Sequence, residues 1–172
     1  TTVTSASSNI RIDNTPPVFN TLTIESNNTT NTAWAQEGNN VTVYMVANET
    51  LIDAPIVSIG GRGGVEVVMN NVGGDDRTYT AVHEMDATDT EGWVEFEVRF
   101  QNAHGLDGET ITAVGDGDHT TDGSKVKYDR QKPTLSVVSI STDNDNTAYA
   151  KAGSIITLDF TAANDGDGNP EN

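Results

Sequence analysis

The sequence predicts an all-β protein, an antiparallel β-sandwich of about seven short strands that is repeated in a tandem array. Three observations carry this prediction. Apolar and polar residues alternate with a period of two, and clusters of Gly, Asn and Asp interrupt the alternation about every ten residues. One stretch of sequence also occurs twice, which is typical of repeat architectures. No long segment has the spacing of an amphipathic helix.

The repeated stretch links two distant parts of the chain. Residues 31–49 (NTAWAQEGNNVTVYMVANE) recur as residues 146–165 (NTAYAKAGSIITLDFTAAND), about 115 residues later, which is a common length for one complete domain. The similarity extends upstream, where residues 13–24 match residues 129–140. The sequence is therefore expected to be one part of a longer tandem array of similar domains.

The repeat predicts three segments. Residues 13–128 are expected to form one complete sandwich. Residues 1–12 align with residues 117–128, so they are expected to be the last strand of a preceding repeat. Residues 129–172 are expected to be the N-terminal part of a following, incomplete repeat.

The first expected strands are residues 19–24, after the Pro16-Pro17 pair, and residues 41–46 (VTVYMV). Both faces of the second strand look apolar, so its register is ambiguous. The later copy places Asp159 at the position of Tyr44, and an unpaired charge is not expected in a core. The residues expected to face inward are therefore Val41, Val43 and Met45, together with Ile156, Leu158 and Phe160 in the copy.

The remaining strands follow in order. The clearest is Trp93–Phe100 (WVEFEVRF), with Val94, Phe96, Val98 and Phe100 on one face and Glu95, Glu97 and Arg99 on the other. Gly60–Gly64 (GGRGG) is expected to be the turn of a hairpin. The other expected strands are Ile56–Ile59, Val65–Met69, Thr78–Met85, Glu109–Val114 and Lys125–Tyr128. About seven short strands in about 115 residues match an immunoglobulin-like sandwich.

Several short motifs support a family resemblance. Asp-x-x-x-Pro stands at both unit boundaries, A-x-x-G-x-x-V-T spans residues 35–42, Ala47–Glu49 follows, and DTEG occupies Asp89–Gly92. In this order the motifs resemble the bacterial-type immunoglobulin-like repeats of very large cell-surface proteins and adhesins. The resemblance implies an extracellular location and a role as a spacer that carries an adhesive module away from the cell.

The charge of the chain limits its partners. Lys and Arg total 9 against 26 for Asp and Glu, a net charge of −17. This charge opposes binding to nucleic acid or anionic lipid. No apolar run approaches the roughly 20 residues of a membrane span, so no direct membrane insertion is expected. The chain has no Cys, which excludes disulfides and thiolate chemistry.

Acidic loops are the main chemical signal. The loop DATDTE contains Asp86 and Asp89, Asp129 opens the linker, and the segment NDGDGN of the next repeat contains Asp165 and Asp167. These five residues are expected to bind Ca²⁺ between adjacent domains, because Ca²⁺ takes six to eight oxygen ligands. The alternative is that the acidic loops only solvate the surface of the protein.

No catalytic constellation is present in the sequence. The nucleophile motif G-x-S-x-G is missing, so no enzymatic activity is expected. His83 shares a strand face with Tyr79 and Met85, which favours a hydrogen-bonded core or edge histidine. His104 is isolated, and His119 lies in a polar loop.

The sequence therefore predicts a structural, non-catalytic module of a long extracellular protein, whose partners are neighbouring repeats. Two alternatives stay open. The chain could be a filament subunit that assembles by strand donation. It could also be an adhesion domain for a carbohydrate or a protein, although Trp34, Trp93 and Tyr44 look scattered through the strands.

Overall fold

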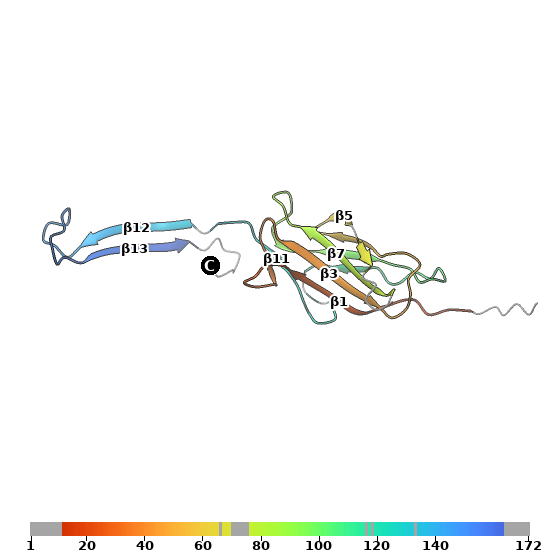
Figure 1. Cartoon of the computed structure of the whole chain (residues 1–172). Coiled ribbons are helices and arrows are strands. Elements are labelled where there is room, and N and C mark those ends of the chain that lie inside the picture. Colours follow the sequence, from red (N-terminus) through yellow and green to blue (C-terminus); the bar gives the residue numbers. More distant parts are fainter. Residues whose placement is uncertain are drawn as a thin grey trace, which may run out of the picture. The chain divides into compact units, whose positions relative to one another are not determined.

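The structure, a computed structural model, describes residues 12–65, 67–69, 76–115, 117, 119–132 and 134–163. Every regular element within these residues is a β-strand, which confirms the all-β class (Figure 1). The chain divides into two compact units, Thr1–Asp129 and Arg130–Asn172. The strand expected at residues 1–12 lies outside the described residues, except for Ile12, which is exposed.

The first sheet of unit 1 has four antiparallel strands. They are β1 (Phe19–Ser26), β3 (Asn40–Ala47), β7 (Thr78–Glu84) and β6 (Val67–Met69), in the spatial order β1-β3-β7-β6. A bulge interrupts the pairing of β1 with β3 between Phe19 and Thr21.

The second sheet also has four antiparallel strands. They are β10 (Ile111–Ala113), β9 (Phe96–Arg99), β4 (Ile56–Ile59) and β5 (Arg62–Val65), in the spatial order β10-β9-β4-β5. The turn between β4 and β5 consists of Gly60 and Gly61, both with positive φ, as a two-residue hairpin turn requires. The sequence predicted that the whole of Gly60–Gly64 is the turn. This prediction is wrong, because Arg62 already pairs with Ile59 in the hairpin.

A third, small sheet joins three strands of two residues each. β11 (Lys127–Tyr128) lies between β2 (Trp34–Ala35), to which it is parallel, and β8 (Gly92–Trp93), to which it is antiparallel. β2 was not predicted, because two residues cannot show an alternating pattern. The predicted strand Trp93–Phe100 is divided into β8 and β9, since Val94 and Glu95 belong to neither.

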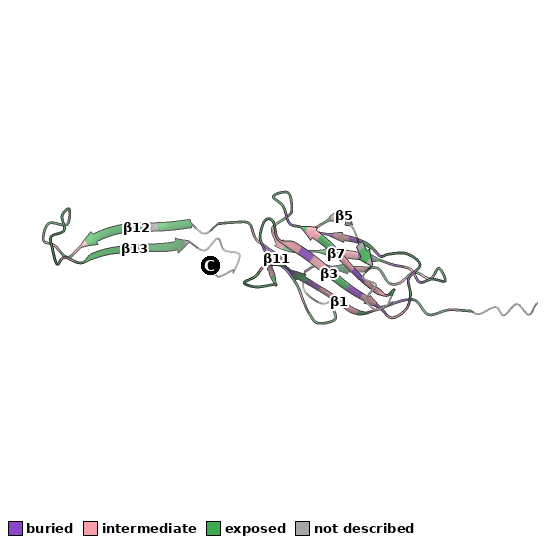
Figure 2. Cartoon of the chain, viewed as in Figure 1, coloured by how far each residue is buried: buried purple, intermediate pink, exposed green. Residues whose placement is uncertain are grey.

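One buried cluster contains side chains from both four-stranded sheets, so the sheets enclose a common core, an arrangement consistent with a β-sandwich (Figure 2). Val41, Val43 and Met45 are fully buried while Tyr44 is exposed, which confirms the register predicted for this strand. The inward face of Trp93–Phe100 is confirmed as well. The core side chains are Leu22, Ile24, Ala35, Val41, Val43, Met45, Ala47, Leu51, Val57, Ile59, Tyr79, Ala81, Met85, Val94, Phe96, Val98, Phe100, Ala113, Val126 and Tyr128.

The outer edge of β1 is covered by the segment before β11. Thr121 donates its amide to the carbonyl of Leu22 at 2.8 Å, and its hydroxyl oxygen accepts the amide of Leu22 at 3.1 Å. The hydroxyl oxygen of Ser124 accepts the amide of Ile24 at 2.9 Å. These contacts satisfy the backbone of an edge strand and keep another chain from pairing with it.

Unit 2 contains one hairpin, β12 (Thr134–Thr142) and β13 (Ile156–Ala163). Its register repeats that of β1 and β3 pair by pair. The bulge recurs too, between Leu135 and Val137. The matching pairs are Leu22–Met45 with Val138–Phe160, Ile24–Val43 with Ile140–Leu158, and Ser26–Val41 with Thr142–Ile156.

The connection within each hairpin repeats as well. Asn40 donates its amide to the side chain of Asn27, and Ile155 donates to that of Asp143 in the same way. In both copies the residue two positions after an Asn donates its amide to that Asn side chain, Ala33 to Asn31 and Ala148 to Asn146.

The two hairpins differ in burial. Ile156, Leu158 and Phe160 are 60%, 59% and 62% exposed, whereas their counterparts Val41, Val43 and Met45 are buried. The prediction that the second set is buried is therefore wrong for this chain. The reason is physical: the hairpin carries the apolar face of a sandwich, but in unit 2 the described residues form no second sheet to cover it.

Candidate functional site

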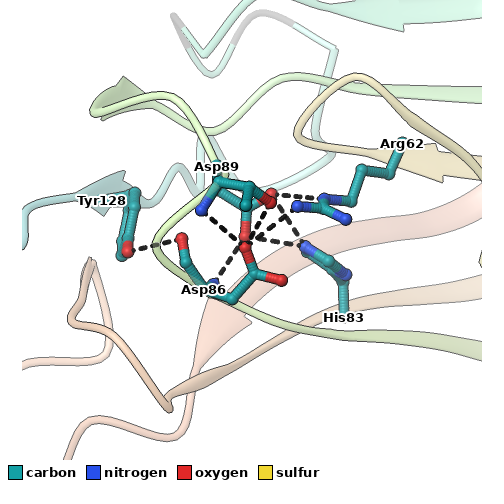
Figure 3. Close-up of polar contacts among 6 residues, drawn as sticks. Arg62, His83, Asp86, Asp89 and Tyr128 are labelled. Atoms are coloured by element: carbon teal, nitrogen blue, oxygen red, sulfur yellow. Dashed lines mark hydrogen bonds and ion pairs between the residues drawn. The ribbon is translucent and has the colours of Figure 1, made fainter.

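The loop between β7 and β8 holds the most concentrated polar cluster of unit 1. It contains Asp86 and Asp89, two of the predicted calcium ligands (Figure 3). Asp89 is buried, with a side chain only 1% exposed, which is unusual for a carboxylate and requires hydrogen-bonding partners.

Three groups surround the Asp89 carboxylate. Nε of Arg62 donates to Oδ1 at 2.8 Å, and the amide of Asp86 donates to Oδ2 at 2.7 Å. Nε2 of His83 lies 3.1 Å from Oδ1 and 3.0 Å from Oδ2. Both oxygens of the buried Asp89 carboxylate therefore have hydrogen-bonding partners. His83 is the hydrogen-bonded histidine that the sequence predicted on this face of its strand.

The Asp86 side chain accepts hydrogen bonds from within the loop and from Arg62. Its Oδ1 accepts the amide of Thr88 at 2.7 Å, the hydroxyl of Thr88, and Nη2 of Arg62 at 3.0 Å. Its carbonyl accepts the hydroxyl of Tyr128 at 2.9 Å (Figure 3). Because Tyr128 precedes Asp129, this bond holds the end of unit 1 beside the loop.

The electrostatics follow from these contacts. Burial opposes the charge of Asp89 and would raise its pKa, but the Asp86 amide, Arg62 and His83 together outweigh burial, so the pKa lies below its ordinary value. The pKa of Asp86 is lowered, first by the hydroxyl of Thr88 and then by its amide. The pKa of Arg62 is raised, chiefly by its hydrogen bond to Asp89.

The structure brings together only part of the predicted calcium site. Asp86 and Asp89 share one cluster, and Asp129 directly follows Tyr128. Asp165 and Asp167 lie outside the described residues. Arg62 occupies the position beside the two loop carboxylates that a cation would take. Arg62 was not foreseen, because it lies 24 residues before Asp86 in the sequence and only the fold brings the two together.

A second polar cluster lies at the opposite end of the first sheet. Asn102 is fully buried, and its Nδ2 donates to Oδ2 of Asp13 at 3.0 Å and more weakly to Glu49. Nδ1 of His104 lies 3.0 Å from the same oxygen of Asp13. One ligand atom each from Asp13, Glu49 and His104 lies within 4.8 Å of the others, and among the described residues this is the group with the spacing of a metal site.

The small sheet gathers a third set of residues. Trp34 and Trp93 both pair with Lys127 in register, one from each neighbouring strand. Nζ of Lys127 lies 5.0 Å from the ring centroid of Trp34, and Nζ of Lys125 lies 4.5 Å from that of Trp93. The two tryptophans looked scattered in the sequence, because β2 and β8 are too short to be recognised as neighbouring strands.

Comparison of the chain with protein-family models, with curated proteins and with solved structures gives no match in any of the three. The described part of the chain contains no helix of the length and hydropathy needed to cross a membrane.

Proposed function

We propose that unit 1 is an immunoglobulin-like domain. The strands are lettered along the chain with the three short strands β2, β8 and β11 of the small sheet left out. The first sheet, β1-β3-β7-β6, then has the order A-B-E-D, and β10-β9-β4-β5 has the order G-F-C-C′. These are the orders of the two sheets of that fold. The buried cluster shared by both sheets supports the same assignment.

We further propose that the protein is a structural, non-catalytic module of a long extracellular surface protein, built from tandem copies of this domain. The observation that carries the proposal is the pair-by-pair match between the β12–β13 hairpin and the β1–β3 pair, including the bulge. A hairpin with this register and an uncovered apolar face has the features of the first two long strands of another copy.

A chimera tests this proposal. In it, residues 49–129 follow Ala163, which stands at the position of Asn48 in the repeat. If the hairpin opens a second domain, the added strands cover Ile156, Leu158 and Phe160, and the amides of β13 become as slow to exchange hydrogen as those of β3. Unit 1 in the same molecule is the internal reference. The matched control is the chimera with Leu158→Asp, which places a charge at a core position.

Unchanged fast exchange in the β13 amides of the chimera would reject the proposal that this hairpin starts a second domain. The array itself has a simpler test. The natural gene product should run on a denaturing gel far above the 18.3 kDa of this chain. A gene product no larger than this chain would contradict the proposed array.

One specific observation favours a second function, that of a filament subunit. β3 pairs on both sides, with β1 and with β7, whereas β13 pairs with β12 alone among the described strands. The other edge of β13 and its apolar face suit strand addition from a neighbouring chain. Sedimentation velocity over a wide concentration range tests this function. Growing oligomers that disappear with Phe160→Asp are expected, and a monomer at every concentration rejects it.

Calcium binding at the Asp86–Asp89 loop stays a prediction. It is supported by two carboxylates in one loop at the end of unit 1 from which the chain leaves. A bound cation there would take the place of the Arg62 guanidinium, so Ca²⁺ and Arg62 would compete for the same oxygens.

A further inference from the structure

The only two tryptophans of the chain lie on one face of the small sheet. Trp34 on β2, Lys127 on β11 and Trp93 on β8 are direct cross-strand partners, so their side chains project to the same side. Neighbouring strands lie about 4.8 Å apart, which puts the backbones of the two tryptophans about 10 Å apart. The result is a surface on which the lysine strand lies between the two strands that carry the tryptophans.

The core does not need these indoles. The chain neighbours of these residues, Ala35, Val94, Val126 and Tyr128, are buried and face inward. Trp93 is 44% exposed and Trp34 is half-buried, so both rings lie on the outer face. Large aromatic side chains in contact with solvent on the outside of a filled sheet mark a contact surface rather than a packing requirement.

The surrounding backbone leaves room for Trp93. Gly115 has a φ of 79°, and a Cβ added there would lie 2.2 Å from Cβ of Trp93. A side chain at position 115 would therefore displace the tryptophan. On the other side, the buried hydroxyl of Ser26 donates to the carbonyl of Trp34, which ties β2 to the end of β1.

Two lysines gather on this surface of an acidic chain. Lys125 and Lys127 are two of only four lysines in a chain with a net charge of −17. Each ammonium lies over an indole ring, at 4.5 Å and 5.0 Å from the centroids. The acidic residues next to this surface in the chain are Glu91 and the exposed Glu95, on either side of Trp93, and Asp129, after β11.

The two kinds of residue recur separately in the neighbouring repeats. The counterpart of Trp34 is Tyr149, which is 69% exposed, and the counterpart of Lys127 in the aligned segment 1–12 is Arg11. The sequence thus keeps an aromatic residue at this position in the following repeat and a cationic residue at the position of Lys127 in the preceding one.

We propose that the surface of Trp34, Lys127, Trp93 and Lys125 binds an acidic polysaccharide. Sugar rings present apolar C–H faces that pack on indole rings, and the two indoles can contact successive parts of one extended sugar chain. The ammonium groups of Lys127 and Lys125 pair with the carboxylates of that chain.

The chain offers a direct optical test, because all tryptophan emission comes from this surface. Polygalacturonate, an acidic polysaccharide, is titrated into the full chain in the presence of a chelator, which keeps calcium from cross-linking the polysaccharide. We expect a saturable blue shift of the emission as the indoles leave water. Fully methyl-esterified polygalacturonate has the same sugar backbone without the charges, and we expect it to bind at least about tenfold more weakly.

Variants locate the ligand. Trp93→Ala and Lys127→Gln are each expected to weaken binding about tenfold or more, read by affinity electrophoresis in polygalacturonate gels. The matched controls are Tyr44→Ala, an exposed aromatic residue on the first sheet, and Lys132→Gln, a lysine of unit 2, and both should bind like the wild type. Unchanged melting temperatures show that the variants remain folded.

Three results would overturn the proposal. They are no spectral change at saturating polysaccharide, equal affinity for the esterified and the free polymer, and wild-type affinity of both site variants. Binding of an acidic polypeptide such as polyglutamate with equal strength would also overturn it, since the indoles would then contribute nothing specific for sugar rings. None of these results bears on the structural role proposed above, which is tested by the chimera.

Discussion

Arg62 and Asp89 form an ion pair whose two partners lie in different environments. Nε of Arg62 lies 2.8 Å from Oδ1 of Asp89, yet the arginine side chain is 41% exposed and the aspartate only 1%. The exposed partner keeps much of its hydration, whereas the buried one depends on its protein partners. The two residues should therefore respond differently to substitution.

Asp89→Asn should destabilise unit 1 by about 1–3 kcal/mol, because the amide cannot accept from Arg62, His83 and the Asp86 amide together and leaves polar groups unpaired. Urea unfolding measures the loss. The control is Arg99→Gln, which breaks the exposed pair of Arg99 with Glu97 on β9 and should cost about 0–1 kcal/mol. Equal losses in the two variants would show that the burial of Asp89 has no energetic consequence.

The low pKa of Asp89 predicts a dependence of stability on pH. A carboxylate whose pKa is lower in the folded than in the unfolded state stabilises the fold above its unfolded pKa of about 3.9, and this contribution is lost as the pH falls through the folded pKa. The free energy of unfolding should therefore fall below about pH 4. Asp89→Asn should decline less steeply over the same range. Parallel curves for the two proteins would assign the acid sensitivity to other carboxylates.

Arg62→Gln should change the response to calcium. The guanidinium donates to both Asp86 and Asp89, so its removal frees carboxylate oxygens that a hard cation can bind. We expect Ca²⁺ to raise the melting temperature of Arg62→Gln more than that of the wild type, with a chelator as reference, because a ligand of the folded state stabilises it. If neither protein responds, the calcium prediction for this loop fails.

The two copies of the hairpin should differ in their sensitivity to truncation. Met45→Ala removes a buried side chain and should cost about 2–5 kcal/mol, whereas Phe160→Ala at the equivalent position should change the unfolding of unit 1 by less than about 0.5 kcal/mol. Thermal unfolding of the two variants compares them directly. A large loss with Phe160→Ala would mean that its ring is buried in solution by a partner.

Much of the fold could be predicted from the sequence, because alternation reports burial wherever one face is apolar. Val94, Phe96 and Val98 were placed correctly for this reason. The ambiguous strand was resolved by comparing Tyr44 with Asp159, since the charged copy identifies the outer face. Alternation also explains the error in unit 2, because it identifies the face suited for burial and says nothing about whether a second sheet covers it.

The candidate sites were harder to predict, because they depend on contacts between segments far apart in the sequence. The acidic loop looked like solvated surface or a cation site, and only the fold places Arg62 and His83 around Asp89. Likewise, Trp34 and Trp93 are separated by most of unit 1 and meet only because β11 lies between their strands.

The matching registers of the two hairpins have a consequence for folding. β1 could pair with β13, and β12 with β3, without losing ladder hydrogen bonds, so the backbone alone does not distinguish the correct partner from its copy. We expect proximity along the chain to make the distinction, because the short connections at residues 27–39 and 143–155 favour local pairing over pairing of distant strands. Thr121 and Ser124 then close the outer edge of β1. We therefore expect local closure of each hairpin to limit the exchange of strands between neighbouring copies.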